Sequence, residues 1–502
     1  MKHRGAKNLI ITILCQLSLL AFGVLIPKIT ISNLGSEANG FLSTINEVFV
    51  YMSLLEGGLG LALLNSLYEL ISNNDTQQIS DVMTASRIKY KKIAKIYMLI
   101  TVGIALVFPL FLKSKLSYSE MALTIIAQGL GGAGTMYLSS SVGQYLIASG
   151  RNYVKEINHL VNYVLTSVSK ILLIVWTKNI VIVTLAHTIF CLLEALIYRY
   201  YFAKKLPEIN LDSKTPKFTN LSEQKYFLIH QISSAIFNAT DLFVISIFCS
   251  LTASSIYAVY ALIFTAISTV MSSVFNSLKY ILGSAYTRGN QYYARIHDQF
   301  DAIYLAIMFS LYFTAFILAN GFIRIYTFGT DANYVDPYLP ILFMTTKLLS
   351  SCRNVCSNTH NIAHRVRQNV IPTVVEAIIN LSVSLALVGP LGIYGVLLGT
   401  VAALLFRTNQ TIIYTNRFIL NRSSWNTYKV IVLYVAAAAV MYFAIDRVVH
   451  IQFNSYLGFV KYLILLLPVV AIIYGLLALA VNRDVRQTVR AEVRKSCSLR
   501  DR

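Results

Sequence analysis

Long apolar stretches follow one another along the whole chain, and short polar segments separate them. Uncharged windows of this kind occur, for example, at 8–27, 121–150 and 377–406. A helix needs about 17–25 mostly apolar residues to cross a bilayer, whereas a membrane strand alternates in polarity over about 10 residues. Because these windows are continuously apolar, the pattern predicts an all-α integral membrane protein.

The ends of the apolar stretches predict about fourteen transmembrane helices. They lie at 8–29, 41–64, 93–112, 119–143, 154–177, 179–199, 226–249, 255–278, 299–320, 336–355, 368–388, 391–414, 428–446 and 457–481. A hydrophilic segment with two prolines separates the sixth span from the seventh. We therefore expect an N-terminal six-helix lobe at 1–200, a cytoplasmic linker at 201–225, a C-terminal six-helix lobe at 226–415, two additional helices at 416–482 and a basic cytoplasmic tail at 483–502.

Composition and charge agree with this interpretation. Hydrophobic residues make up 56% of the chain and charged residues only 13%, against roughly 25% charged residues in soluble domains. The net charge is +20. If the N-terminus is inside, the outer side receives only seven of the 42 lysines and arginines, namely Lys28, Lys113, Lys115, Lys178, Arg324, Arg447 and Lys461. The positive-inside rule then predicts that both termini are cytoplasmic.

In the second predicted span, the stretch between Glu47 and Glu69 carries one carboxylate, Glu56, inside an apolar run, and Gly57, Gly58 and Gly60 follow it. An acid at membrane depth costs several kcal/mol unless it faces protein, water or an ion, so Glu56 is a candidate functional residue. The glycines allow a neighbouring helix to approach closely or the helix to bend. The alternative is that Glu56 only forms a hydrogen bond across a helix interface.

Two further acids of the predicted spans are candidate functional residues. Asp241 is the only charged residue between Lys225 and Lys279, and Asn238 precedes it on the same helical face. Glu376 lies in the eleventh span. Such residues either line a substrate or ion pathway or hold helices together, and both uses turn them toward the protein interior.

Four basic residues of the predicted spans are candidates for contact with an anionic substrate. Lys28 and Arg407 are close to the ends, so we expect their long side chains to reach the headgroups. Lys170 and Lys347 lie deeper, in the fifth and tenth spans. A cavity location is an equal alternative for these two, because a charge in mid-membrane is costly.

Three histidines in predicted spans, His159, His187 and His230, titrate near neutral pH and are candidates for proton relay. Histidines that are simply hydrogen-bonded at an interface are commoner.

No pattern typical of an enzyme occurs in the sequence. It has no GxxxxGK[ST] loop, no HExxH and no GxSxG with partners. The six cysteines are scattered and do not have the spacing of a zinc site. We therefore predict no enzymatic activity, no metal and no cofactor other than a coupling ion such as H⁺ or Na⁺. The basic tail is expected to rest on the anionic inner leaflet and not to bind nucleic acid.

Four local patterns occur in an order that resembles a known family. They are LGSEANGFLSTI at 34–45, LLEGGLGLALLNSLYE at 54–69, FNATDLFVISIF at 237–248 and GPLGIYGVLLGT at 389–400. Together with the number and order of the spans, they are similar to the polysaccharide transporters, or Wzx-type flippases, of the multidrug/oligosaccharidyl-lipid/polysaccharide (MOP) exporter superfamily. The resemblance covers nearly the whole chain.

The resemblance implies a MATE-like bundle of two six-helix lobes plus two peripheral helices that opens alternately to each side of the membrane. It implies transport of undecaprenyl-diphosphate-linked oligosaccharides across the bacterial plasma membrane for O-antigen, capsule or exopolysaccharide synthesis. Glu56, Asp241 and Lys170 would line or gate the passage. The implied partners are the lipid-linked substrate, membrane lipids and polysaccharide polymerase machinery. Related flippases often place several arginines in the cavity, whereas the deep cations of this chain are lysines.

Two alternatives stay open on the sequence alone. A MATE-type drug or cation antiporter belongs to the same superfamily, although twelve spans would be usual for it. A membrane polysaccharide polymerase or glycosyltransferase would be expected to need a large extramembrane loop or an acidic metal site, and the sequence predicts neither.

Overall fold

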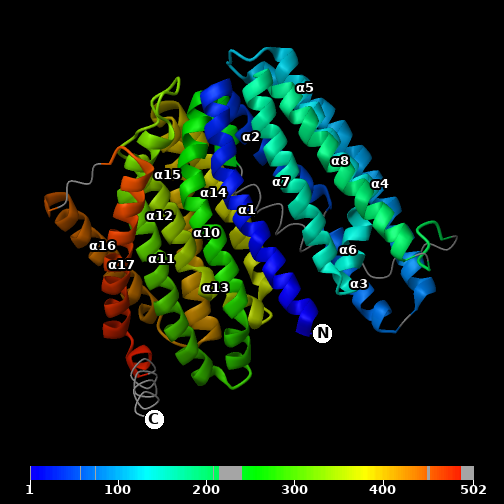
Figure 1. Ribbon diagram of the computed structural model, residues 1–502. Coiled ribbons are helices and arrows are strands. Elements are labelled where there is room, and N and C mark those ends of the chain that lie inside the picture. Colours follow the sequence, from blue (N-terminus) through cyan, green and yellow to red (C-terminus); the bar gives the residue numbers. More distant parts are fainter. Residues whose placement is uncertain are drawn as a thin grey trace, which may run out of the picture. The chain divides into compact units, whose positions relative to one another are not determined.

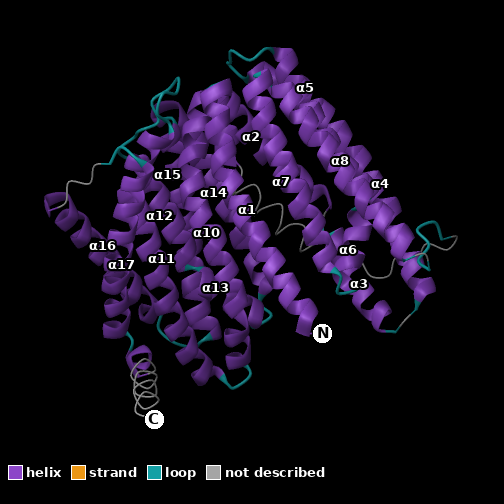
Figure 2. Cartoon of the chain, in the orientation of Figure 1, coloured by secondary structure: helices purple, strands orange, loops and turns teal. Residues whose placement is uncertain are grey.

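The structure is a computed structural model, and it describes residues 2–56, 58–73, 75–206, 208–213, 240–448 and 453–487. Within these ranges the chain is almost entirely helical and contains no strand (Figure 2). The all-α prediction is therefore confirmed for the described part. Several predicted features lie outside the described residues, namely Gly57, Asn238, the first part of the seventh span, residues 214–225 of the linker and residues 488–502 of the tail.

The helices follow one another with short connections (Figure 1). The first eight are α1 Lys2–Leu34, α2 Ser36–Ser53, α3 Leu59–Ser72, α4 Thr76–Val107, α5 Tyr118–Leu138, α6 Ser140–Ala148, α7 Asn152–Thr177 and α8 Ile180–Lys205. After a helical segment at 240–248 come α10 Leu251–Tyr286, α11 Asn290–Tyr326, α12 Leu339–Cys352, α13 Asn354–Ile362, α14 Val370–Leu391, α15 Ile393–Tyr414, α16 Trp425–Val448 and α17 Tyr456–Val481.

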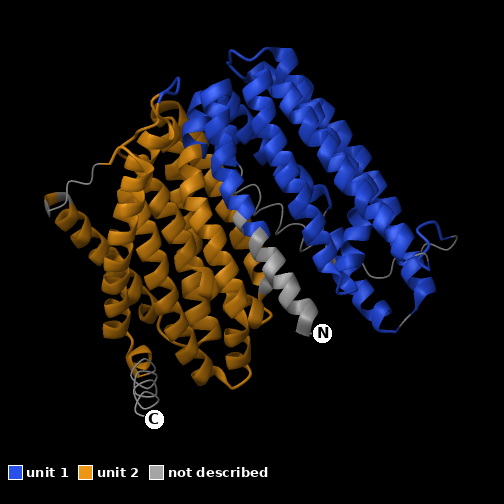
Figure 3. Cartoon of the chain, in the orientation of Figure 1, with its two compact units in different colours: residues 1–258, 329–332 blue, residues 259–328, 333–502 orange. Residues whose placement is uncertain are grey.

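The chain divides into two compact units (Figure 3). The N-terminal unit consists of residues 1–258 and 329–332, and the C-terminal unit consists of residues 259–328 and 333–502. The division falls inside α10. The finer partition into two six-helix lobes, a linker and two additional helices stays a prediction.

Ten helices of the described part are long and apolar enough to cross a membrane. They are α4, α5, α7, α8, α10, α11, α14, α15, α16 and α17. This finding supports a multi-pass membrane protein, while the count of fourteen spans stays a prediction.

Three stretches that were expected to be continuous spans are interrupted, so the prediction is wrong there. The span at 41–64 is divided into α2 and α3, the span at 119–143 is divided into α5 and α6, and the span at 336–355 ends in a break before α13. Polar or glycine residues stand at each break. Ser139 donates its hydroxyl to the carbonyl of Thr135 (3.0 Å), and Arg353 turns to an ion pair with Glu376. At two of the breaks the backbone itself leaves the α-helical range, with φ 71° at Gly58 and φ −133° at Ser139.

Local sequence signals explain where some helices begin. Ser117 and Glu120 form a capping box at the start of α5. Asn179 accepts hydrogen bonds from the backbone N–H groups of Val181 and Ile182 and so caps α8. These caps fix where α5 and α8 begin in the N-terminal unit.

Candidate functional site

Most spanning helices expose apolar side chains, as contact with lipid requires. The exposed side chains of α7 include Ile157, Val161, Leu165, Leu172 and Trp176. Those of α16 are similarly apolar. Faces of this composition suit the hydrocarbon of a bilayer.

Helix α10 differs because part of its exposed surface is polar. The polar positions recur every three or four residues and therefore share one side of the helix. They are Thr265, Thr269, Ser272, Ser273, Asn276 and Ser277, and we call them the α10 polar face. The neighbouring exposed side carries Val270, Val274 and Leu278. A spanning helix with this division turns its apolar side to lipid and its polar side to protein or water.

The α10 polar face offers both donors and acceptors. The hydroxyl groups of Thr269, Ser273 and Ser277 donate to backbone carbonyls four residues earlier, at 2.9, 3.2 and 2.9 Å. Their oxygen lone pairs remain available as acceptors. Asn276 forms no hydrogen bond with the described part of the chain, so its amide is available to a ligand.

The predicted site residue Lys347 lies at this face. Its Nζ atom on α12 donates to the hydroxyl of Thr265 on α10 (3.3 Å). The C-terminal unit therefore presents a cation beside a row of hydroxyl and amide groups.

The N-terminal unit encloses a polar cavity of about 110 Å³ among α1, α2, α5, α7 and α8. Its polar lining comes from Thr30, Asn39, Ser43, Asn46, Gln128, Lys170, Thr184 and His187, beside Pro27 and apolar side chains. Gln128 donates its amide to Asn46 (2.6 Å). We call this space the Lys170 cavity. It is polar and large enough to hold water or a small polar group.

Lys170 is a cation without an acidic partner in the described part of the chain, where no ion pair includes it. It lies seven residues before the end of α7, about 10 Å along the helix. An ammonium at this depth requires hydration or a bound anion. The cavity location that the sequence left open is therefore the one that the structure has.

Glu56 lies at the break between α2 and α3 instead of inside one continuous span. The chain makes a short 3₁₀ turn over Leu54–Glu56, and α3 begins after Gly58, whose φ of 71° suits glycine. The expectation of a bend beside the acid is confirmed.

The carboxylate of Glu56 is hydrogen-bonded at this break. The hydroxyl of Tyr90 on α4 donates to its Oε1 atom (2.6 Å). A Cβ atom on Gly60 would lie 2.8 Å from the carboxylate of Glu56 and 2.7 Å from the amide of Gln144, so a larger residue there would displace these two side chains. The interface interpretation accounts for these contacts, and a pathway role for Glu56 stays a prediction.

Asp241 is also buried and hydrogen-bonded, with an exposed fraction of 4%. The hydroxyl of Tyr257 on α10 donates to its Oδ2 atom (2.9 Å). The neighbouring Thr240 forms a hydrogen bond with Tyr51 of α2 (3.2 Å). The structure does not describe Asn238, so its role beside Asp241 stays a prediction.

Glu376 lies between two arginines in the C-terminal unit. Arg353 Nη1 is 2.7 Å from one carboxylate oxygen, and Arg407 Nε is 3.4 Å from the other. We call Arg353, Glu376 and Arg407 the arginine triad. Arg407 is only 5% exposed, so the expectation that it reaches the headgroups is wrong. An interior carboxylate compensates part of the cost of burying its charge.

Glu194 is a polar centre that the sequence interpretation missed. Its carboxylate on α8 accepts hydrogen bonds from Asn162 (2.7 Å) and Tyr198 (3.0 Å) and lies 3.3 Å from His159 Nδ1. The available signal was the one that singled out Glu56, because Glu194 is the only acid in the sixth predicted span.

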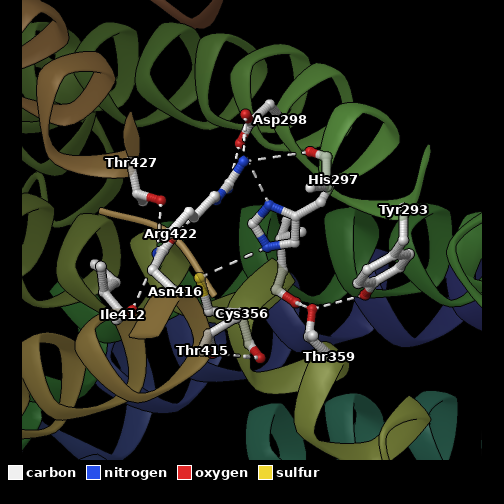
Figure 4. Close-up of polar contacts among 12 residues, drawn as sticks. Tyr293, His297, Asp298, Cys356, Thr359, Ile412, Thr415, Asn416, Arg422 and Thr427 are labelled. Atoms are coloured by element: carbon white, nitrogen blue, oxygen red, sulfur yellow. Dashed lines mark hydrogen bonds and ion pairs between the residues drawn. The ribbon is translucent and has the colours of Figure 1, made fainter. Parts of the chain in front are cut away.

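A second missed centre joins α11 to the connection between α15 and α16 (Figure 4). Both terminal nitrogens of Arg422 are 2.6 Å from the carboxylate oxygens of Asp298, and its Nε atom donates to Asn416 (2.8 Å). His297 Nε2 lies 3.8 Å from the sulfur of Cys356. This bidentate pair holds an irregular helix end in place, and we interpret it as structural.

An open apolar groove of about 620 Å³ lies between α11 and α17. Five of the residues that line the groove are small, namely Ala306, Ser310, Ala471, Gly475 and Ala478. Its volume and composition fit a flexible hydrocarbon chain.

Comparison with known proteins gives a match in structure but not in sequence. No family model matches the chain, and no curated protein matches it. The lipid II flippase MurJ in an inward closed conformation has a TM-score of 0.70 at 13% identity, covering 93% of this chain and 98% of that chain. An inward-facing multidrug resistance MATE family transporter of the MOP superfamily has a TM-score of 0.64 at 15% identity, covering 80% and 98%.

A third solved structure is a MOP superfamily transporter from Pyrococcus furiosus with a binding pocket of reverse polarity. Its TM-score is 0.55 at 14% identity, covering 82% of this chain and 95% of that chain. At these identities the likeness shows the fold alone. The protein has the fold of MATE transporters and MurJ, which confirms the MATE-like architecture that the sequence predicted.

Proposed function

We propose that this protein is a flippase for undecaprenyl-diphosphate-linked oligosaccharide repeat units, which it moves across the bacterial plasma membrane by alternating access. The observation that supports this proposal most is the Lys170 cavity. Lys170, for which the described residues supply no carboxylate partner, faces a polar space inside spanning helices. The negative charge of a diphosphate would compensate it.

The sugar part of such a substrate needs many weak hydrogen bonds, and the α10 polar face can supply them. Its hydroxyl groups and the amide of Asn276 match the donors and acceptors of a carbohydrate. Lys347, which reaches Thr265 at this face, adds a positive charge. We assign Lys347 to contact with the diphosphate or an acidic sugar.

The lipid part of the substrate needs an apolar surface that remains open to the bilayer. The groove between α11 and α17 has this character. We assign it to the isoprenoid chain, which would give α17, the last of the C-terminal helices, a function in substrate binding.

The remaining predicted residues have roles in gating in this proposal. Glu56 with its glycines lies at a helix break, where a change in hydrogen bonding can be coupled to bending. Asp241 lies in the segment before α10, and its carboxylate connects that segment to Tyr257 of α10. Both termini are cytoplasmic, and a gradient of H⁺ or Na⁺ or the membrane potential drives transport. We expect no enzymatic step.

The main rival function is drug or cation antiport. Solved multidrug MATE transporters share the fold, and acids such as the half-buried Glu56 and the buried Asp241 would suit a cationic substrate. The rival does not explain why Lys170 borders a polar cavity with no acidic partner among the described residues, because a cationic substrate would be repelled there.

The proposal can be tested in vesicles that contain the purified protein and a labelled lipid-diphosphate oligosaccharide. The exposure of the sugar to a membrane-impermeant lectin measures flipping. We expect the wild-type protein to increase the rate at which the sugar becomes exposed. With Lys170→Met this rate should be lower by a factor of about ten or more. Lys95→Met, at an exposed lysine of α4, is the matched control. Transport of a drug cation without movement of the lipid would favour the rival.

A further inference from the structure

Helices α7 and α8 pack side by side (Figure 1), and polar side chains on them extend from the Lys170 cavity to residues that have no role in the proposed function. On each helix these residues are three, four or seven positions apart and so share one face. They are His159, Tyr163 and Lys170 on α7, and His187, Cys191, Glu194 and Tyr198 on α8. We call this set the α7–α8 polar column.

One end of the column is the contact between His159 and Glu194. The carboxylate of Glu194 has three neighbours, of which Asn162 and Tyr198 are neutral donors. His159 is the one that changes charge near neutral pH. Its side chain is 45% exposed, whereas that of Glu194 is 15% exposed. A proton can therefore reach the imidazole while the carboxylate stays shielded.

The pair has two states that differ by one proton on His159. With the proton, imidazolium and carboxylate form a neutral ion pair at 3.3 Å. Without it, Glu194 is a carboxylate at membrane depth with only neutral donors, which is costly. The pair is therefore built to hold one proton, and its net charge becomes more negative by one when that proton leaves.

The other end of the column is the Lys170 cavity. The sulfur of Cys191 is 3.7 Å from His187 Nε2, and His187 lines the cavity together with Lys170. Lys170 follows His159 by eleven residues on the same side of α7, which is about 16 Å along the helix. The column thus connects a titratable pair to the proposed anion site inside one compact unit.

Other titratable groups also face this pair. On α7 they are Lys155 and Glu156, one turn before His159. On α1 there is the buried thiol of Cys15. These groups add a fixed background, since only His159 combines titration near neutral pH with direct contact to Glu194.

We propose that the His159–Glu194 pair is a proton-binding site whose occupancy is linked to anion binding at Lys170. This inference rests on the proposed function. A proton on His159 makes the column more positive and strengthens the hold of Lys170 on a diphosphate. When the proton leaves, the negative charge of Glu194 is no longer compensated, and the hold of Lys170 on the diphosphate becomes weaker. By linkage, a bound diphosphate retains the proton equally, so the two move together.

The size of the effect follows from the distance. A unit charge about 16 Å away, at an effective dielectric constant of about 20, changes an affinity about fivefold. This lies at the lower end of the usual coupling between two sites, roughly 5- to 150-fold.

The test measures binding of P1,P2-dimethyl diphosphate, whose two charges do not titrate between about pH 5 and 8, to the full-length protein in detergent. We expect wild-type affinity to rise about fivefold as the pH falls through the titration of His159. His159→Gln keeps a donor for Glu194 but cannot titrate, so its affinity should be independent of pH. Glu194→Gln keeps the titrating imidazole but removes the carboxylate that favours its protonated form, so its rise in affinity should occur at lower pH than in wild type.

The matched control is His364→Asn, at an exposed histidine with φ 54° outside the column, where asparagine tolerates the backbone conformation. It should keep the wild-type pH dependence. If His159→Gln and Glu194→Gln bind the probe with the wild-type pH dependence, the linkage is wrong while the proposed function stands. If wild-type protein does not bind the probe at any pH, or Lys170→Met binds it equally well, both proposals are wrong.

A second measurement avoids the variants of the pair should they fail to fold. In ¹⁵N-histidine spectra of the folded wild-type protein, the probe should move the titration midpoint of His159 to higher pH, because linkage is reciprocal. The same midpoint with and without saturating probe would overturn the proposal.

Discussion

The two units each hold a cation deep in a helical bundle, and the two cations have opposite surroundings. Arg407 in the C-terminal unit is 5% exposed and lies against Glu376, which also binds Arg353. Lys170 in the N-terminal unit borders a polar cavity, and no ion pair of the described residues includes it. Both would be counted as intramembrane charges from the sequence. Only their partners distinguish a structural cation from a ligand-binding one.

This difference teaches that the cost of a buried charge can be met in two ways. Where the fold itself supplies the counter-charge, removal of one partner leaves the other uncompensated and destabilises the protein. Where a ligand supplies it, removal of the charge relieves the empty protein and harms only binding. Removal of a charge should therefore lower stability at the arginine triad, whereas at Lys170 it should lower binding without lowering stability.

The largest expected effect is on stability at the arginine triad. Glu376→Ala leaves the buried Arg407 and the half-buried Arg353 without their carboxylate, so we expect a loss of about 3–5 kcal/mol in the free energy of unfolding. Thermal and denaturant unfolding of the purified protein in detergent measures it. Glu69→Ala, at an exposed glutamate of α3, should change stability little.

The triad can be tested further by replacing all three residues with apolar ones of similar size. Arg353→Met, Glu376→Leu and Arg407→Met together should recover most of the stability, because no unpaired charge remains. A stability equal to that of wild type in Glu376→Ala alone would contradict the structural role of the triad.

The next effect is on binding at Lys170. Lys170→Met should keep or raise the stability of the empty protein, since it removes a charge that has no acidic partner in the described part. It should lower the affinity for a dialkyl diphosphate about 10- to 100-fold, as expected for loss of a charge-assisted contact worth about 1.5–3 kcal/mol. Binding and unfolding measured on one preparation separate the two. Destabilisation as large as that of Glu376→Ala would show that Lys170 has a structural partner.

A smaller effect is expected at the α10 polar face. Asn276→Val removes an amide that is free to bind a sugar, so flipping should slow by about two- to tenfold, corresponding to one hydrogen bond of about 0.5–1.5 kcal/mol. Stability should not fall. Val274→Ile, on the apolar side of the same helix, is the control. Equal slowing in both variants would mean that the polar side has no special role.

The smallest effect concerns pH and a structural histidine. Burial lowers the pKa of His360, which lies in α13 beyond the predicted span and contacts Asn369 (2.7 Å) and Thr415 (2.9 Å). The unfolded chain therefore takes up a proton at higher pH than the folded one. Stability should fall as the pH drops below about 6.5, by at most about 1.4 kcal/mol per pH unit.

The variant His360→Gln should reduce this loss when melting temperatures are compared between about pH 8 and 5. His364→Asn, at an exposed neighbour, should melt with the same pH dependence as wild type. An unchanged pH dependence in His360→Gln would contradict the assignment.

The fold class followed from the sequence because apolar runs of spanning length depend on composition alone. The bend beside Glu56 was also predictable, since Gly58 takes a conformation that suits glycine. The environments of the charged residues could not be predicted from the sequence. Nothing local distinguishes Arg407, which meets a carboxylate 31 positions earlier in the chain, from Lys170, which meets a cavity formed by five helices. Such partners are set by tertiary packing.

The α10 polar face was present in the sequence but concealed by its surroundings. Serines and threonines in a spanning helix satisfy their own hydroxyl groups on the backbone, so they do not interrupt an apolar pattern. Only exposure in the folded chain showed that Asn276 and its neighbours share one side. The roles of Asp241 and Asn238 stay predictions, because neither the sequence nor the structure tests them.

In the proposed function, the α10 polar face lines a water-accessible pathway for an anionic headgroup. The most direct test is the reactivity of single cysteines on α10. In a background without the six native cysteines, Asn276→Cys and Val274→Cys are treated with a charged, membrane-impermeant thiol reagent. We predict that the cysteine at position 276 reacts and is protected by lipid-diphosphate oligosaccharide, while the cysteine at position 274 stays unmodified. Equal reactivity at both positions, or reaction at 274 alone, would contradict the account.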